Sequence, residues 1–399
     1  MNQRTSSVIP LKVIMVGALP VDHAEVKGGV EAVILNLLKS FTFLGGNIDV
    51  THLAFSKEIR KETTIALSDN VRIRFVPFII PLELVDYIIN GKTLNRIIDE
   101  ERADIIHIQE ITPHLLRFLT FPKERVIVTQ HGIMAEEFKY ASGVSQRLKC
   151  LFKAAVERYA FPRFRNIIFI SQYNRRLYDG IPSNETQIFN PVNPIFFEKV
   201  TAAKSKKNNL LYVGVLSRRK NIKLVIEALH ELNQQGYSFE LHVAGGFKEA
   251  AYEEEVMSVV DQFGLKDRIH FHGWLKQEQI RALYEICPLF VLPSMQETLP
   301  VSIAEAMAQG KIVIASDVGA IREMLTDRES GFLFMRNDKN DLVQTFAEVF
   351  DVADGNRIGE AARAEALDKF DPQKIALETI KFYRQVLGTM SPREGGKDS

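Results

Sequence analysis

Residues 289–316, LFVLPSMQETLPVSIAEAMAQGKIVIAS, decide the fold class of this 399-residue chain. The apolar run Leu289–Pro293 predicts a buried strand, the loop Ser294–Pro300 follows it, and residues 301–309 predict a helix. A glycine then ends the helix, and Lys311–Ser316 predicts the next strand. Strand, helix and strand in this order are typical of a parallel sheet with helices on both faces.

The same alternation continues in both directions along the chain. Further strands are expected at Lys12–Gly17, Ile48–Phe55, Val71–Val76, Asp104–Gln109, Arg125–Thr129, Asn166–Ile170, Leu210–Val215, Phe239–Gly245, Arg268–Gly273 and Gly331–Phe334. Amphipathic segments between them, such as 29–44 and 84–102, predict helices.

The polar stretch Thr201–Asn209 interrupts this alternation and predicts a linker between two domains. We therefore expect two doubly wound α/β domains, residues 1–195 and 205–371, and a terminal helix at 372–388 that packs back toward the first domain. Because open α/β sheets bind ligands at the carboxyl ends of their strands, function is expected in the loops that face a common cleft.

Composition excludes several classes of protein. Basic and acidic residues number 50 each, so no overall field favours nucleic acid. Two cysteines, Cys150 and Cys287, are too few for a disulfide framework or a cysteine zinc site, which fits a reducing cytoplasm. The sequence has neither a run of about 18 apolar residues nor a signal-peptide core, so a cytoplasmic location without a transmembrane helix is expected.

Two glutamates follow the strand of the opening segment. A helix that begins just after a strand offers free N–H groups to an anion, and Glu297 lies in the loop before that helix. Glu305 lies within the helix, so the two carboxyl groups could flank a diphosphate and bind hydroxyl-bearing groups on either side. The alternative is a solvated loop residue and a charge on the helix surface.

Three cations, Arg218, Arg219 and Lys220, stand between a strand and the start of the next predicted helix. Positive charge is unfavourable at the positive end of a helix dipole, which indicates an anion that offsets the repulsion. The alternative is that these long side chains point into water.

In the first half, the pair Gly28 and Gly29 opens a predicted helix, and His131 follows the strand 125–129. Glycines allow a ligand to approach the backbone, and a histidine at the carboxyl end of a strand faces the cleft. A simple turn and a structural histidine are the alternatives. The dinucleotide fingerprint G-x-G-x-x-G is absent here, which disfavours a nicotinamide-dependent oxidoreductase.

The chain contains no Asp-x-Asp, no H-E-x-x-H and no cysteine pair with zinc spacing. Neither a metal ion nor a cofactor is therefore expected at a diphosphate. Lys220, a neighbouring arginine and helix dipoles would neutralise its charge.

These motifs together resemble the GT-B-fold retaining glycosyltransferases of family 4. The resemblance runs from about Lys12 to about Leu387 and rests on an ordered series of motifs, of which Pro-Ser-x-x-Glu-x₇-Glu-Ala-Met is the most specific. The others are Gly28-Gly29, Gln130-His-Gly132, Ile170-Ser171 with Asn190-Pro-Val-Asn193, Val213-Gly-Val-Leu-Ser-Arg-Arg-Lys220, Val243-Ala-Gly-Gly246 and Phe271-His-Gly-Trp274.

The resemblance implies a role for each matching residue. Glu297 would contact the hydroxyls of the donor sugar, Glu305 the nucleotide ribose, and Lys220 the diphosphate. His131 would lie beside the reacting sugar, so that His131, Glu297 and Lys220 form the expected catalytic set. The expected donor-binding set is Gly28, Gly29, Arg218, Arg219, Lys220, Trp274, Leu275, Glu297, Thr298, Leu299 and Glu305, with Trp274 and Leu275 holding the base largely through backbone.

The chain departs from the family pattern at two places. Val215 stands where members usually have arginine, so one diphosphate cation is missing unless Arg218 or Arg219 replaces it. Thr298-Leu-Pro300 stands where the usual sequence is Gly-Phe-Gly.

The expected function is transfer of a sugar from a nucleotide-sugar to an acceptor hydroxyl with retention of the anomeric configuration. The acceptor would be a glycan, a lipid-linked glycan or a small molecule. A GT-B epimerase or hydrolase acting on nucleotide-sugars and a non-catalytic nucleotide-sugar-binding regulator are the alternatives.

Two segments of the first half suggest peripheral contact with a membrane. Phe75–Leu82, FVPFIIPL, is unusually apolar for a loop, and Lys139–Arg176 holds nine basic residues against one acid, Glu157. A buried loop and an ordinary solvated helix face are the alternatives.

Overall fold

The structure is a computed structural model of the chain. It describes residues 10–22, 26, 28–77, 93–109, 121–132, 136, 138–140, 143–181, 183–198, 207–351 and 355–388. Residues 201–206 of the expected linker Thr201–Asn209 and residues 78–82 of the apolar segment Phe75–Leu82 lie outside the described residues. Residues 75–77 end a strand rather than form a loop, and Phe75 is fully buried in the sheet.

The described part of the first domain contains an eight-stranded sheet of order β3-β4-β2-β1-β5-β6-β7-β8. The strands are β1 (Leu11–Val16), β2 (Ile48–Ser56), β3 (Thr63–Ser68), β4 (Val71–Pro77), β5 (Ile105–Ile108), β6 (Val126–Gln130), β7 (Asn166–Phe169) and β8 (Asn184–Gln187). All neighbours pair in parallel except β3, which runs antiparallel to β4 at the edge.

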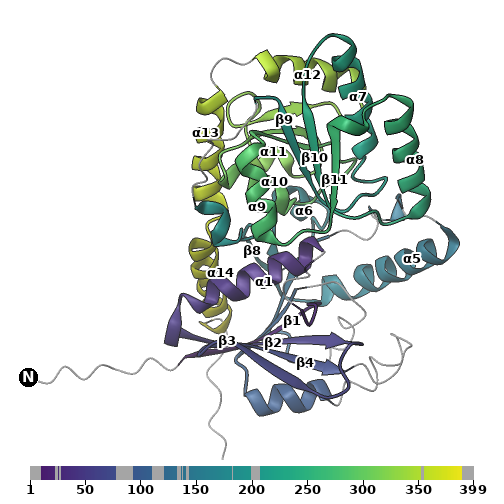
Figure 1. Cartoon of the computed structure of the whole chain (residues 1–399). Coiled ribbons are helices and arrows are strands. Elements are labelled where there is room, and N and C mark those ends of the chain that lie inside the picture. Colours follow the sequence, from purple (N-terminus) through teal and green to yellow (C-terminus); the bar gives the residue numbers. More distant parts are fainter. Residues whose placement is uncertain are drawn as a thin grey trace, which may run out of the picture.

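The second domain is built on a six-stranded parallel sheet of order β11-β10-β9-β12-β13-β14. Its strands are β9 (Asn209–Val213), β10 (Glu240–Ala244), β11 (Ile269–Gly273), β12 (Leu289–Leu292), β13 (Ile312–Ser316) and β14 (Phe332–Phe334). Chain order reverses between β9 and β12, and ligands of doubly wound sheets bind beside such a reversal. The chain therefore has two Rossmann-like domains in the GT-B arrangement (Figure 1).

Helices cover both sheets (Figure 1). They are α1 (Gly29–Thr42), α5 (Gly143–Ala160), α6 (Gln172–Arg176), α7 (Ile222–Gln234), α8 (Ala250–Gln262), α9 (Gln277–Ile286), α10 (Val301–Ala308), α11 (Ile321–Met324), α12 (Lys339–Asp351), α13 (Gly355–Lys369) and α14 (Pro372–Gly388). Their apolar residues recur at helical spacing, as in α7, where the buried face includes Val225, Leu229 and Leu232. No helix in the described ranges is long and apolar enough to cross a membrane.

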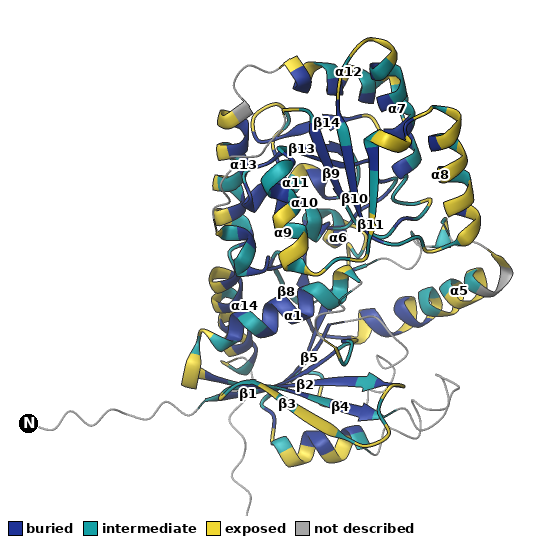
Figure 2. Cartoon of the chain, in the orientation of Figure 1, coloured by how far each residue is buried: buried dark blue, intermediate teal, exposed yellow. Residues whose placement is uncertain are grey.

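The last helix, α14, returns to the first sheet and packs along α1. Its face formed by Ile375, Ile380 and Tyr383 is buried in the same hydrophobic core as β1 and β2 (Figure 2). Burying a large aliphatic or aromatic side chain contributes about 1.5–3 kcal/mol, so this face is enough to hold the helix there.

A carboxylate joins the two domains a second time. Glu323 of α11 accepts hydrogen bonds of 2.7 Å from the backbone N–H groups of Gln172 and Tyr173, the first residues of α6. These amides have no partner within their own helix, so a carboxylate there satisfies them and complements the helix dipole.

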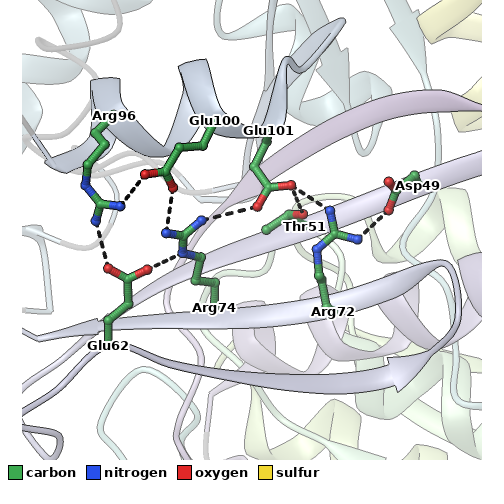
Figure 3. A network of polar contacts seen from close by, with 8 residues as sticks. All are labelled: Asp49, Thr51, Glu62, Arg72, Arg74, Arg96, Glu100 and Glu101. Atoms are coloured by element: carbon green, nitrogen blue, oxygen red, sulfur yellow. Dashed lines mark hydrogen bonds and ion pairs between the residues drawn. The ribbon is translucent and has the colours of Figure 1, made fainter.

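A network of ion pairs fixes the outer edge of the first sheet (Figure 3). Arg72 on β4 contacts Asp49 and Glu101 at 2.6 Å each, while Arg74 contacts Glu101 at 3.2 Å and Glu100 at 2.9 Å. Both glutamates belong to the helical segment that includes residues 93–101, so the network fastens that segment to the sheet.

Candidate active site

A cleft of about 570 Å³ lies between the two domains. Its lining includes most of the residues expected to bind the donor: Gly28, Gly29, His131, Arg219, Lys220, Trp274, Leu275, Glu297, Thr298, Leu299 and Glu305. Val215, which replaces the usual arginine, also lines it.

An ion pair between Lys220 and Glu297 lies at the reversal point of the second sheet. Lys220 comes from the loop after β9 and Glu297 from the loop after β12, and these strands are neighbours. The Lys220 Nζ atom is 2.5 Å from Glu297 Oε1, and Glu297 is only 4% exposed. Burial acts to raise the pKa of the Glu297 carboxyl, but Lys220 and Arg219 outweigh it and hold that pKa below its usual value.

Arg219 joins the two loops that carry this pair. Its Nη1 donates to the backbone oxygen of Gln296 at 2.9 Å and lies 3.7 Å from Glu297 Oε2. The N–H of Met295 in turn donates to the Arg219 carbonyl at 2.8 Å. The cation is therefore held in the cleft beside Lys220.

Arg218, which was also expected to bind the donor, is directed away from the cleft. Its guanidinium is 2.6 Å from Glu255 on α8 and lies over the ring of Tyr252, and it is not among the residues that line the cleft. Adjacent loop residues direct their side chains differently, and here Arg219 faces the cleft while Arg218 faces α8.

Glu305 projects into the cleft from α10 and is 6% exposed. Burial raises the pKa of its carboxyl to about 8. The group is therefore largely protonated at pH 7, so Lys220 and Arg219 face one buried carboxylate, Glu297. Two positive charges against one negative charge make this part of the cleft attractive to an anion.

His131 enters the cleft from the first domain, one residue after β6. Burial lowers the pKa of its imidazole to about 4, so the ring is neutral at pH 7. Its Nε2 lies 2.8 Å from Gln109 Oε1, which assigns the ring proton to Nε2 and leaves Nδ1 as an acceptor. Nδ1 is buried and makes no hydrogen bond of normal geometry, although the Asn190 side chain is close enough to act against the lowering of the ring pKa.

Two residues that support His131 were not predicted from the sequence. Gln109, directly after β5, holds His131 with its oxygen and faces His107 with its Nε2. His107 is itself fixed by Thr129 and by Tyr383 of α14, each at 2.6 Å. Buried polar residues at strand ends give no local sequence signal, although the position of Gln109 at a strand terminus places it near the cleft.

The glycine pair begins α1 at the opposite wall. A Cβ atom built on Gly29 would meet nothing within 4 Å, so this residue leaves space in the cleft. The N–H of Gly28 donates to Glu31 Oε2 at 3.1 Å, which caps the helix with a carboxylate of its own.

Glycines also allow close contacts under the far wall. A Cβ on Gly246 would lie 2.3 Å from Nε1 of Trp274, so the indole packs directly on that backbone. Gly319, which has no motif around it that marks it in the sequence, has a φ of +57° and lies against the backbone of Glu297. A Cβ there would lie 1.7 Å from the Glu297 carbonyl oxygen, so a side chain cannot be added without moving Glu297.

The chain matches two family descriptions that together span most of its length. Residues 27–194 match "Glycosyltransferase Family 4" and residues 195–365 match "Glycosyl transferases group 1". The chain belongs to the family 4 glycosyltransferases. As a member of this family it uses a nucleotide-sugar donor.

One relative of this family 4 glycosyltransferase matches nearly its whole length. An uncharacterized glycosyltransferase of Methanocaldococcus jannaschii is 24% identical over 386 residues, covering 94% of this chain and 99% of that protein. Sucrose-phosphate synthase from Thermosynechococcus elongatus has the same fold, with a TM-score of 0.81 and 20% identity over 95% of this chain and 100% of that one. The Anabaena protein HepE, solved in complex with UDP-glucose, has a TM-score of 0.70 and 17% identity over the same shares.

Proposed function

We propose that this glycosyltransferase moves a sugar from a nucleotide-sugar to an acceptor hydroxyl with retention of the anomeric configuration. The observation that carries the proposal is the Lys220–Glu297 pair at the sheet reversal, facing His131 and Gly29 across one cleft. Cations at a strand end suit a diphosphate, and neutral polar groups opposite them suit a sugar.

Departure of the nucleoside diphosphate is the step that these residues assist. Negative charge grows on the diphosphate as the bond to the anomeric carbon breaks, and Lys220 and Arg219 stabilise it. Lys220 exchanges its contact with Glu297 for the diphosphate, which leaves the Glu297 carboxylate to accept hydrogen bonds from sugar hydroxyls. Glu305 contacts the ribose from α10.

Retention follows from a same-face reaction in this proposal. The cleft residues that the structure describes on the first-domain side include no carboxylate that could act as a covalent nucleophile. The acceptor hydroxyl attacks the face that the diphosphate leaves and passes its proton to the departing phosphate oxygen. His131, held neutral with Nδ1 open, lies beside the reacting sugar.

We also propose that no metal ion assists the diphosphate. The sequence lacks Asp-x-Asp, and Lys220 and Arg219 supply two positive charges where that motif's metal would act. A divalent ion would duplicate charge that the protein already provides.

The test is a screen of nucleotide-sugars with glycan and lipid-linked acceptors, read by release of nucleoside diphosphate and by mass of the product. For the sugar that is transferred, NMR coupling at the anomeric carbon should show the configuration of the donor. The rate should be unchanged by EDTA. Inversion, or an activity that EDTA abolishes and Mg²⁺ restores, would overturn the corresponding part of the proposal.

A surface on α5 suggests that the acceptor lies at a membrane. Leu148 and Tyr159 are 60% and 55% exposed, and Leu151 and Phe152 continue the same outward face at helical spacing. Exposed basic residues flank this stripe: Arg147, Lys149 and Arg158. Glu157, the single acid of Lys139–Arg176, is buried and accepts from Gln130, so the outward face carries no negative charge.

An apolar stripe with basic flanks fits an anionic lipid surface. In Figure 1 the N-terminal half of α5 projects away from the body of the protein, where it can reach such a surface. Sedimentation with phosphatidylglycerol vesicles should bring down the wild type, and the double variant Leu148→Glu, Leu151→Glu should remain in solution. Leu377→Glu, a change at an equally exposed leucine on α14, is the matched control and should still sediment. Equal sedimentation of all three proteins would contradict membrane contact through α5.

A further inference from the structure

A cluster of three histidines and a glutamate lies at the edge of the second sheet, outside the cleft. Glu240 and His242 are two residues apart on β10, and His270 and His272 are two residues apart on β11. Residues two apart on a strand share a face, and His242 is the parallel partner of His270. The four side chains therefore gather on one face of the two strands.

Three atoms of this cluster have the spacing of metal ligands. Glu240 Oε2 lies 3.7 Å from His242 Nε2 and 3.8 Å from His270 Nε2, and the three atoms all lie within 4.8 Å of one another. Ligand atoms of a tetrahedral zinc ion, with bonds of about 2.0–2.2 Å, are roughly 3.3–3.6 Å apart. Small rotations of the side chains would bring the three atoms to that spacing.

The buried histidine of the cluster has an open nitrogen that faces the glutamate. His242 is 7% exposed, and its Nε2 has no hydrogen-bond partner in the structure. A buried polar atom without a partner is unfavourable, and binding of a cation at that atom removes this cost.

His272 lies where it can orient His242 for a metal. Its Nε2 is 3.0 Å from Nδ1 of His242, and in the tautomer that a metal requires, Nδ1 carries the proton and donates it to His272. The lone pair of His242 then resides on Nε2, toward Glu240 and His270. Metal-binding histidines are ordinarily oriented by such a contact at the other ring nitrogen.

We propose that Glu240, His242 and His270 bind a zinc ion, with His272 as a positioning residue. Two imidazoles and one carboxylate are a ligand set that zinc accepts, whereas Mg²⁺ and Ca²⁺ prefer oxygen ligands. The His270 side chain is 39% exposed and that of Glu240 31%, so an ion can enter from solvent and a water molecule can complete the coordination.

The ion would stabilise the fold and take no part in sugar transfer, because none of its ligands lines the cleft. It would tie the edge strand β11 to β10. β11 leads directly into Trp274, so the tie also steadies one wall of the cleft.

The test uses the untagged full chain, stripped with EDTA and dialysed, in titration calorimetry with ZnCl₂. One ion should bind per chain, and Zn²⁺ should raise the thermal midpoint. Glu240→Gln and His270→Ala, at partly exposed positions that leave the fold intact, should weaken binding at least tenfold. His230→Ala, on α7 outside the cluster, should bind as the wild type does.

The positioning role of His272 is tested by zinc titration of two further variants. His272→Ala should weaken zinc about tenfold, and His272→Gln should restore much of the affinity because its amide oxygen can accept from Nδ1. Absence of zinc binding by the wild type, or full affinity in both Glu240→Gln and His270→Ala, would overturn the proposal.

Discussion

Lys220 Nζ and Glu297 Oε1 are 2.5 Å apart, although 77 positions separate them in the sequence. The pair is nearly fully enclosed, so each charge depends on the other for stabilisation. In the proposed reaction a diphosphate takes over the lysine and leaves the glutamate to the sugar, so the two groups are already in place before the donor binds.

Arg219→Ala should lower catalytic efficiency by about tenfold or more, while Arg218→Ala should leave it within about twofold of the wild type. A charge-assisted hydrogen bond contributes about 1.5–3 kcal/mol, and 1.4 kcal/mol corresponds to a factor of ten. Arg219 faces the cleft beside Glu297, whereas Arg218 pairs with Glu255 at the surface. Steady-state kinetics with the best donor compares the two variants. Equal effects would contradict the proposal that Arg219, and not Arg218, faces the diphosphate.

Substitutions of the two cleft glutamates should have different effects, one on nucleotide affinity and the other on turnover. Glu305→Ala removes ribose contacts that are made in both the ground state and the transition state, so affinity for the nucleoside diphosphate should fall. Glu297→Ala should instead reduce kcat more than affinity, because it orients the sugar at the reacting centre. Titration calorimetry and kinetics measure the two quantities. Unchanged nucleotide affinity in Glu305→Ala would remove that residue from the site.

Glu305 should also make stability depend on pH. Its pKa is raised from 4.5 to about 8 in the folded protein, so between those values the folded state holds a proton that the unfolded state lacks. The contribution of Glu305 to the free energy of unfolding is therefore fully present below pH 4.5 and is lost as the pH rises to about 8. The loss is a few kcal/mol at most. Thermal unfolding should show Glu305→Gln close to the wild type at pH 5 and more stable than it at pH 8.5. A difference that does not change with pH would contradict the burial argument.

Gly319→Ala should lower the activity indirectly, by displacing Glu297, although residue 319 is not proposed to contact a substrate. Its Cβ would lie 1.7 Å from the carbonyl oxygen of Glu297, and the φ of +57° adds strain, so the Glu297 loop must shift. We expect kcat to fall at least tenfold and the thermal midpoint to drop. Gly236→Ala is the matched control, because it also has positive φ but has no atom within 4 Å of the added Cβ. It should lose stability and keep its turnover.

The sequence was sufficient to predict the second sheet. All six strands lie within two residues of their predicted positions. Five are rich in buried apolar residues, as strands of a parallel sheet usually are, while the edge strand β11 is only partly buried. In the first sheet β3 and β8 were not predicted. Both are edge strands whose residues are partly or wholly exposed, such as Asn184–Gln187, so neither has an apolar run to reveal it.

The site was predictable to the level of loops but not of individual contacts. Strand ends placed Lys220, Glu297 and His131 at one cleft, and the structure brings them there. The choice between Arg218 and Arg219 depends on side-chain direction, which neighbouring residues of a loop do not share. Gln109 and Gly319 act through contacts with residues distant in sequence, so no local pattern marks them.

The most direct test of the proposal that Lys220 holds the diphosphate compares the catalytic efficiencies of Lys220→Ala and Lys223→Ala. Both lysines are near the start of α7, but Lys223 pairs with Glu255 at the surface, so its variant controls for general loss of charge. With the donor identified by the screen, and with circular dichroism confirming that both variants fold, kcat/KM should fall more than tenfold for Lys220→Ala and stay unchanged for Lys223→Ala. Full efficiency in Lys220→Ala with every donor tried would show that this loop does not hold the diphosphate.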